Sequence, residues 1–385
     1  MSKEPDRSSF FVALVVVDVL AGLADAISGP YIVLFLVDDA RLDPLSLSAI
    51  LTARALGAIA FATLFGAWVD RRTNITPLLI ALSGSALGYG LLAATTNFAF
   101  LMIVAAIPIA VGAAAFSQSI ALVKRQFDHA SPHTANRAIG VMRASWSLAW
   151  AVGPAIGATV AAASGFRAVF VTSAASAAIA IATLAVVRAR PVSGAAAYRE
   201  RRESPNGGLT IALAFAALAL FHTALFMGSV PLPIVVTSAL GGTERDVGLM
   251  FSLCAALEIV VMGALIWRPL RRRERAAIAA GFAAFAAYYV VLAVARSVGP
   301  VFWAQILRAI SIALVTYLGI GFVQTLMPRR AGAAAALFSN AAQVGSVVAA
   351  LGVGALAQAF GYPSIFVACA ALSAAGFVII CLVRA

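Results

Sequence analysis

The chain has 385 residues, of which 63% are hydrophobic and 11% charged, with a mean hydropathy of +1.00. A soluble fold cannot hide this share of apolar side chains in one core, because its surface needs more polar cover. The composition therefore excludes a soluble globular protein and makes lipid the solvent. Cys254, Cys369 and Cys381 all fall in apolar stretches, so we expect neither a disulfide nor a metal site, and no cofactor.

Twelve apolar stretches follow one another along the chain, and crossing the hydrocarbon layer of a membrane takes roughly 20 residues. They cover approximately residues 10–37, 45–69, 77–95, 98–123, 135–163, 168–187, 209–239, 246–267, 276–295, 300–327, 331–360 and 362–383. The first is too long for a signal-peptide core and lacks a convincing cleavage site, so we expect it to remain as the first span. We predict an all-α membrane protein with twelve transmembrane helices.

The gaps between these stretches differ sharply in positive charge. With the N-terminus in the cytoplasm, the inside segments hold 20 Lys and Arg residues and the outside segments hold 4, while the other 3 of the 27 lie within spans. Cytoplasmic segments carry the excess of positive charge in membrane proteins. We therefore predict a multi-pass protein of the bacterial inner membrane with both termini cytoplasmic. Topology and anionic lipid then explain the net charge of +12, and no nucleic-acid partner is expected.

The only long polar gap divides the chain into equal halves. Residues 188–208 are predicted to form a cytoplasmic linker between one six-helix bundle at 1–187 and a second at 209–385. A weak repeat supports this division. The segment GAWV at 66–69 corresponds to GALI at 263–266, and Gly165-Phe166 corresponds to Gly361-Tyr362.

Polar side chains other than Ser and Thr are unevenly shared among the spans. The third, sixth, ninth and twelfth spans hold no Asp, Glu, Arg, Asn, Gln or His, so we expect these helices to face lipid while the others enclose an aqueous cavity. The polar residues inside the other spans are Asp18, Asp25, Arg54, Gln118, Arg143, His222, Glu258, Gln305, Arg308, Gln324, Asn340, Gln343 and Gln358.

Two motifs resemble those of the major facilitator superfamily. The segment GAWVDRR at 66–72 resembles the signature G-x-L-a-D-r-x-G-r-k, with Trp68 in place of the Leu and a different tail. The segment GPAIG at 153–157 resembles the G-P-x-x-G element of exporters. The resemblance implies two pseudo-symmetric six-helix bundles without enzymatic activity. It also implies gating roles for Gly66, Asp70, Arg71, Gly153, Pro154 and Gly157.

The chain resembles the sugar-efflux branch of that superfamily more specifically than the superfamily as a whole. Related strings occur at MRASWSLAW (142–150), AALEI (255–259) and QTLMP (324–328), followed by Asn340 and Gly345, in matching order and spacing. This resemblance implies export of sugars or related small polar molecules, driven by protons, with a small-molecule substrate and a monomeric protein. The direction of transport rests on the resemblance alone.

Six charges inside the spans suggest three ion pairs. A charge at mid-membrane costs about 2.5 to 3.5 kcal/mol on insertion scales. The spans contain equal numbers of acids (Asp18, Asp25, Glu258) and cations (Arg54, Arg143, Arg308). Asp25 lies near the middle of the first span and close to Arg54 of the next. The pair could exchange a proton for a salt bridge during transport, or it could be a static link between two helices; the sequence favours neither. Asp18 is expected to serve as a gate or a structural pair.

Candidate substrate contacts lie on several spans. Arg143, Trp146 and Trp150 recur on one face of the fifth span, and a guanidinium beside indoles suits a sugar, although both indoles could simply pack. Glu258 is expected first in an ion pair or polar network and second as a direct ligand. Arg308, Gln118, Gln305, Asn340 and Gln343 complete the candidates, with interhelical hydrogen bonds as the alternative for the amides. His222 is a minor candidate, because a lone helical histidine more often packs.

Two other function classes compete with sugar export. A multidrug or other metabolite proton antiporter of the same superfamily would also carry the G-P-x-x-G element and an acid in the first span. A membrane-embedded enzyme would need a nucleophile and base or a metal-ligand cluster at bilayer depth, and the spans contain one histidine and no such spacing.

Overall fold

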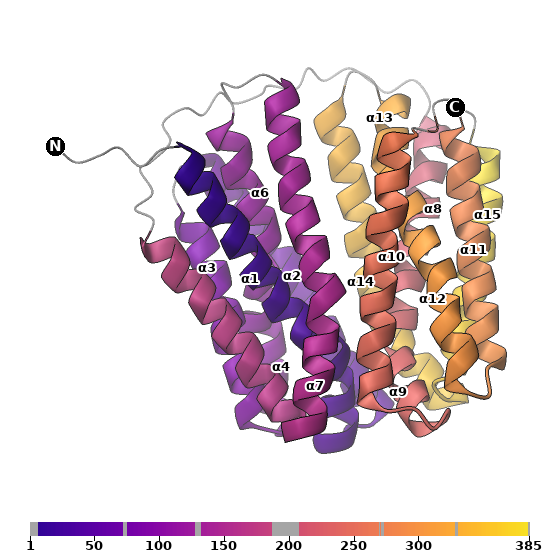
Figure 1. Ribbon diagram of the computed structural model, residues 1–385. Coiled ribbons are helices and arrows are strands. Elements are labelled where there is room, and N and C mark those ends of the chain that lie inside the picture. The colour runs from indigo at the N-terminus through magenta and orange to yellow at the C-terminus, as the bar shows by residue number, and fades with distance from the viewer. Residues whose placement is uncertain are drawn as a thin grey trace. The chain divides into compact units, whose positions relative to one another are not determined.

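The computed structural model describes residues 7–71, 75–127, 132–186, 208–268, 270, 273–327 and 330–383. Every regular element in these ranges is a helix (Figure 1). Residues 188–207 of the predicted linker lie outside the described residues, and α8 begins at Gly208.

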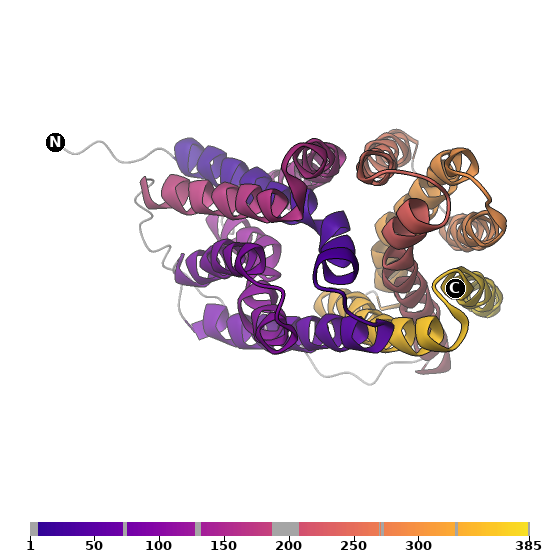
Figure 2. The same cartoon turned by 90° about the horizontal axis from the view of Figure 1, so that it is seen from below.

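The first half of the chain forms α1 (Arg7–Leu34), the π-helical turn η1 (Phe35–Asp39), α2 (Pro44–Arg71) and α3 (Thr76–Ala94). It continues with α4 (Phe98–Val104), the π-helical turn η2 (Ala105–Ile109), α5 (Ala110–Gly112), α6 (Ala115–Gln126) and α7 (Pro132–Val186). The second half forms α8 (Gly208–Ser229), α9 (Pro231–Ser238), α10 (Glu244–Trp267) and α11 (Glu274–Val294). It ends with α12 (Val298–Ile312), the π-helical turn η3 (Ala313–Tyr317), α13 (Leu318–Leu326), α14 (Ala331–Phe360) and α15 (Ser364–Leu382). Figure 2 shows these helices from below, along their lengths.

Twelve crossings are present, as predicted. The described residues form eleven continuous helical segments long and apolar enough to span a membrane, and one of them, Arg137–Val186, is 50 residues long. That segment breaks at Gly165, whose φ of 76° and ψ of 176° are not helical, so it contains two spans. Gly361 has a φ of 79° between α14 and α15, so the two matched glycines of the repeat turn the chain at corresponding places.

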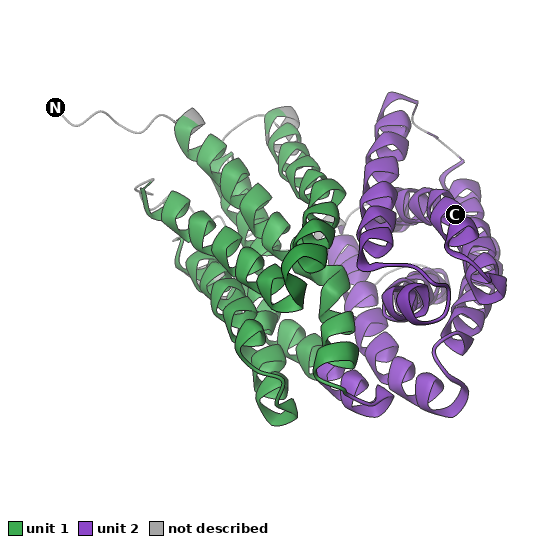
Figure 3. Cartoon of the chain, turned by 60° about the horizontal axis from the view of Figure 1, so that its bottom comes forward, with its two compact units in different colours: residues 1–41, 53–198 green, residues 42–52, 199–385 purple. Residues whose placement is uncertain are grey.

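The chain divides into two compact units, coloured separately in Figure 3. Unit 1 comprises Met1–Arg41 and Ala53–Tyr198, and unit 2 comprises Leu42–Thr52 and Arg199–Ala385. The first turns of α2 thus belong to unit 2, although the rest of the helix belongs to unit 1. Within unit 2, Ser48 Oγ donates a hydrogen bond to the Ala350 carbonyl of α14 at 2.5 Å.

The second and eighth spans, α2 and α10, begin with the same kind of N-cap. The Asp43 carboxylate accepts hydrogen bonds from the backbone N–H groups of Leu45 (2.9 Å) and Ser46 (3.1 Å), and Thr243 Oγ1 accepts one from Asp246 (3.3 Å). Hydrogen bonds from the Ser46 side chain and backbone, and from Leu45, hold the pKa of Asp43 below its ordinary value. Burial, followed by the nearby Asp43 carboxylate, raises the pKa of Tyr362 in the loop before α15.

The burial pattern around the second and eighth spans indicates a local repeat register of 200 residues. Residues 31–50 and 231–250 share the same sequence of buried, half-buried and exposed positions except at Ala49 and Leu249. The predicted match of Gly66 with Gly263 is therefore displaced by three residues. Buried Phe65 corresponds instead to buried Leu265.

Small residues let α1 and α7 approach closely in unit 1. A side chain added at Gly153 would meet the Ala26 Cβ at 2.5 Å, and one at Gly157 would overlap the Ile27 carbonyl and the Tyr31 ring. Tyr31 donates its hydroxyl to the Pro154 carbonyl at 2.8 Å. The GPAIG segment is therefore a helix-packing surface in this structure.

Candidate functional site

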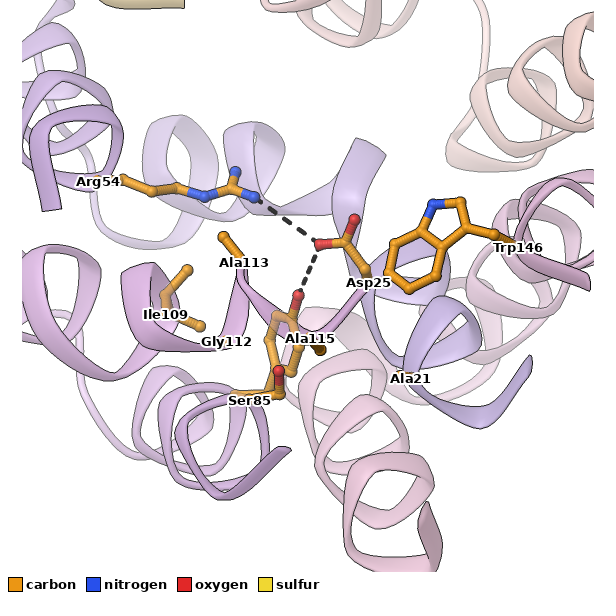
Figure 4. Close-up of a pocket in the computed structure, with 10 residues that line it drawn as sticks. Ala21, Asp25, Arg54, Ser85, Ile109, Gly112, Ala113, Ala115 and Trp146 are labelled. Carbon is orange, nitrogen blue, oxygen red and sulfur yellow. Dashed lines mark hydrogen bonds and ion pairs between the residues drawn. The ribbon is translucent and has the colours of Figure 1, made fainter. Parts of the chain in front are cut away.

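Asp25 is the centre of a polar cluster in unit 1 (Figure 4). Its Oδ1 lies 3.7 Å from the Arg54 Nη2 of α2 and accepts a hydrogen bond from the Tyr89 hydroxyl of α3 at 3.0 Å. The Arg54 and Asp25 side chains are 36% and 33% exposed, so both can meet water. Of the three predicted ion pairs, this is the one that forms among the described residues.

A cavity of about 100 Å³ adjoins this cluster. Small-molecule sites usually measure about 300 to 1,000 Å³, whereas one water needs only about 10 to 15 Å³. The cavity therefore has room for several waters but not for a whole sugar. Its lining, all from unit 1, consists of Ala21, Asp25, Arg54, Ser85, Tyr89, Ile109, Gly112, Ala113, Ala115 and Trp146.

Local helix geometry explains how these groups meet. Ala21 and Asp25 are one turn apart on α1, and Ser85 and Tyr89 are one turn apart on α3, so each pair shares a face. Gly112 brings its backbone against α3, because any side chain there would overlap the Ser85 hydroxyl. Ile109 ends η2, where Pro108 lacks the N–H that a regular helix would use.

The role of the third span corrects the sequence prediction. That span was expected to face lipid because it carries no Asp, Glu, Arg, Asn, Gln or His, yet α3 supplies a buried tyrosine that donates to Asp25. Tyr89 was missed because phenols were not counted among the polar groups. Its position one turn after Ser85, on a face that includes buried Gly88 and Leu92, is the signal that could have found it.

Asp18 departs from the expected ion pairing. Its side chain is 0% exposed, and its Oδ2 lies 2.8 Å from the Ser145 hydroxyl of α7. None of the described residues places a cation within 4.0 Å of it. A serine was not anticipated as a partner, because hydroxyls inside membrane helices usually bond their own backbone.

The two tryptophans of α7, Trp146 and Trp150, have different surroundings. Trp146 lines the Asp25 cavity and lies 4.9 Å, between ring centroids, from Phe116. Trp150 covers Gly29 of α1, where an added side chain would lie 3.0 Å from the indole. Trp150 therefore packs between helices. Arg143 is exposed, and no ion pair to it forms among the described residues.

Unit 2 has its own buried cation. Arg308 of α12 is 6% exposed; its Nη2 donates to the Ser229 hydroxyl at 2.9 Å, and its guanidinium lies 4.8 Å from the Phe251 ring centroid. Nη1 makes no hydrogen bond to any residue that the structure describes. Glu258 of α10 acts on Arg308 electrostatically, but among the described residues the two form no ion pair within 4.0 Å. The expected Glu258 pair is thus replaced by a longer-range interaction.

The amide and histidine candidates are mostly held by their own helices. Gln305 is 0% exposed and donates to the Val301 carbonyl at 3.1 Å, and His222 lies 2.8 Å from the Leu218 carbonyl. Gln118 is 6% exposed, and within the described part of the chain its Oε1 accepts no hydrogen bond. Asn340 is exposed, and Gln343 donates weakly to Ser339 at 3.5 Å.

Comparison with known proteins decides the family. The model of the Major Facilitator Superfamily matches residues 14–327. The chain belongs to the major facilitator superfamily. It is accordingly a transporter and not an enzyme, with a small-molecule substrate, and it is a multi-pass membrane protein.

Superfamily members with similar sequences carry sugar-efflux names. A provisionally named sugar efflux transporter of Deinococcus radiodurans is 35% identical over 93% of this chain and 94% of its own. Sugar efflux transporter A of Escherichia coli is 26% identical over 94% and 93%. Sugar efflux transporter A of Dickeya chrysanthemi is 28% identical over 96% and 94%. The predicted resemblance to the superfamily and its sugar-efflux branch is confirmed.

Solved superfamily structures share the fold. A point mutant of the nucleoside transporter NupG has a TM-score of 0.80 at 12% identity and covers 97% of this chain and 100% of its own. A bacterial homolog of the human lysosomal transporter Spinster has a TM-score of 0.76 at 15% identity, with coverage of 99% and 97%. The predicted major facilitator fold is thereby confirmed.

The superfamily's signature residues lie at the end of α2. Gly66 is exposed, with no atom within 4 Å of an added side chain, so it does not mediate close packing here. The side chains of Asp70 and Arg71 lie outside the described part of the chain. Gly153, Pro154 and Gly157 form the contact with α1 described above.

Proposed function

We propose that this superfamily member exports sugars or related small polar molecules by alternating access and proton antiport. The three relatives named as sugar efflux transporters support the substrate class and the direction. The Asp25, Arg54 and Tyr89 cluster, which holds an ionisable carboxyl beside a water-sized cavity, supports proton coupling.

The coupling step follows from the charges of this cluster. When Asp25 is ionised, Arg54 balances its charge, Tyr89 donates to it, and the carboxylate can also accept a hydrogen bond from a substrate hydroxyl. When Asp25 binds a proton, the neutral carboxyl is a weaker acceptor and releases both Arg54 and the substrate. A proton and a substrate then compete for the same carboxylate, which is the requirement for antiport.

The proposed substrate contacts in unit 1 are Arg143 and Trp146, which offer a guanidinium and an indole face. In unit 2 they are Glu258 and Arg308. These two side chains act on each other without forming a close ion pair, and Nη1 of Arg308 makes no hydrogen bond among the described residues, so both groups can still bond a substrate. Asn340, Gln343 and Gln118 are further donors and acceptors. Gln305 contributes through helix packing, since it is fully buried.

A multidrug or other metabolite proton antiporter is the second candidate. Trp146 and the Asp25 carboxyl line the same cavity, and an acid beside an indole also suits an apolar cation. A toxicity screen of cells lacking the gene, against sugars and cationic drugs, separates these candidates.

Everted membrane vesicles with an acidic interior test the proposal. Wild-type vesicles are expected to accumulate labelled sugar, and Asp25→Asn is expected to reduce accumulation to the level seen without a gradient while sugar exchange persists. The matched control is Asp43→Asn, which changes an exposed carboxylate outside the spans to another good helix cap. Unchanged gradient-driven accumulation in Asp25→Asn would show that this carboxyl does not couple transport.

A further inference from the structure

Asp18 is a second carboxyl on α1, seven residues before Asp25. Two helical turns separate them by roughly 10 Å along the axis. Asp25 is one-third exposed and faces a guanidinium, whereas Asp18 is 0% exposed. The two acids of α1 therefore differ in their surroundings: Asp25 meets water and a cation, whereas Asp18 is shielded from water.

If the Asp18 carboxyl is ionised, the contacts around it contain two hydrogen-bond acceptors and only one hydrogen to share between them. Ser145 Oγ lies 2.8 Å from Asp18 Oδ2 and also 2.8 Å from the Met142 carbonyl oxygen. A serine hydroxyl carries one hydrogen, and both of these neighbours would then be acceptors only. If Oδ2 carries a proton, it donates to Ser145, and Ser145 donates to Met142. Each oxygen of the chain is then satisfied.

Apart from two serine hydroxyls, the described surroundings offer nothing that would stabilise a negative charge. Ser145 of α7 and Ser119 of α6 are the groups that act on the carboxyl. Among the described residues, no charged or titratable side chain of α1, α3, α6 or α7 acts on it, including Asp25, Tyr89 and Arg143. Ser119 lies near the carboxyl, but neither its Oγ nor Asp18 Oδ1 makes a hydrogen bond to any of the described residues. A buried carboxylate without a cation or a full set of donors is strongly disfavoured.

We propose that Asp18 is a proton-binding site of its own, which holds a proton on Oδ2 in this conformation through the chain to Ser145 and Met142. The proton leaves to water when α1 and α7 separate enough to wet the carboxyl, and it returns when they close. Two carboxyls of α1 then exchange protons in each cycle. Their contribution to transport rests on the proposed function, but the protonation of Asp18 does not.

Infrared difference spectroscopy of the purified full-length protein tests the protonation directly. A protonated-carboxyl C=O band at neutral pH is expected in the wild type, absent from Asp18→Asn and retained in Asp25→Asn. The band should disappear reversibly as the pH is raised. A spectrum unaffected by Asp18→Asn would overturn the proposal, as would a band that persists to the pH of unfolding.

Ser145→Ala keeps the test decisive if Asp18→Asn fails to fold. Removing the acceptor of the Asp18 O–H should move the C=O band to higher frequency, whereas an ionised Asp18 would show no such band to move. In proteoliposomes, the sugar gradient supported by a given pH gradient should correspond to one proton fewer per sugar in Asp18→Asn. Loss of all transport in the wild type with the band present would count against the proposed function alone.

Discussion

The carboxylate of Asp25 is held by two groups of different kinds. The Tyr89 hydroxyl is within hydrogen-bond distance at 3.0 Å, whereas the Arg54 guanidinium is a nearby charge at 3.7 Å in a partly hydrated setting. Exposure weakens the ion pair through solvent screening, while a hydrogen bond to a charged group retains its directionality. Tyr89 therefore contributes substantially to the balance between the ionised and the protonated acid.

Tyr89→Phe is expected to alter the pH profile of transport. The Tyr89 hydroxyl donates a hydrogen bond to the Asp25 carboxylate and so stabilises its charged form. Losing this donor should shift the pH profile of sugar uptake toward higher pH. Tyr289→Phe is the control, because Tyr289 lies at the same repeat position but donates to the Ala224 carbonyl. It should lower thermal stability and leave the pH profile unchanged; equal profiles for both variants would contradict the role of Tyr89.

Charged residues inside spans were visible from the sequence, but their partners were not. Asp25 and Arg54 were recognised because a charge interrupts an apolar run, and their proximity was expected from adjacent helices. The serine beside Asp18 and the tyrosine beside Asp25 were not recognised, because hydroxyls are common in such helices. The rotation of each helix decides which partner is met. A helix that is apolar on nearly all sides does not encode this rotation in its periodicity.

At the level of elements, the positions of the spans were predictable and their contacts were not. Hydropathy gave all twelve crossings, and the break at Gly165 matched a predicted boundary between spans. The sequence did not reveal that α2 would divide between units, since its first turns differ little in composition from the rest. Ser48 in these first turns packs closely against Gly354 of α14, and this is a tertiary feature.

The contact between α1 and α7 depends on glycine at specific positions. Gly157→Ala is expected to lower the thermal stability of the detergent-solubilised protein by about 1 to 3 kcal/mol, because the new methyl group would overlap the Ile27 carbonyl and the Tyr31 ring. Gly90→Ala in α3 is the control. No atom lies within 4 Å of its added methyl group, so it should be neutral or stabilising by up to about 1 kcal/mol. Equal unfolding temperatures for the Gly157→Ala and Gly90→Ala variants would show that α1 and α7 can move apart at this contact without loss of stability.

Across the whole molecule, the repeat preserves the scaffold and not the charges. Tyr89 and Tyr289 share a repeat position, but Asp25 and Arg54 correspond to Leu225 and Cys254. Likewise Arg308 corresponds to Pro108. The repeat therefore supplies the packing of each half, while the proposed proton site in unit 1 and the buried cation of unit 2 have no counterparts at the matching positions of the other half.

Alternating access requires the two units to move against each other, and α2 belongs to both. Under the proposed alternating access, we expect its first turns to change their contacts during the cycle. In this structure they are fixed by Ser48, which is 6% exposed and packs where an added side chain at Gly354 would overlap it. A methyl group at position 354 should disfavour this arrangement by about 1 to 3 kcal/mol, which changes its population about 5- to 150-fold.

Labelling of Ser48→Cys with a soluble maleimide measures that change, in protein whose exposed Cys381 has been replaced by serine. Gly354→Ala should accelerate labelling about 5- to 150-fold over the parent, in proportion to the lost packing. Gly352→Ala is the matched control on the same helix, because its methyl group would meet only the flexible Met227 sulfur at 3.0 Å. If both variants label at the parent rate, the first turns of α2 are not held by Gly354. If only Gly354→Ala accelerates labelling, Gly354 holds the first turns of α2, and under the proposed alternating access the same variant should slow sugar exchange.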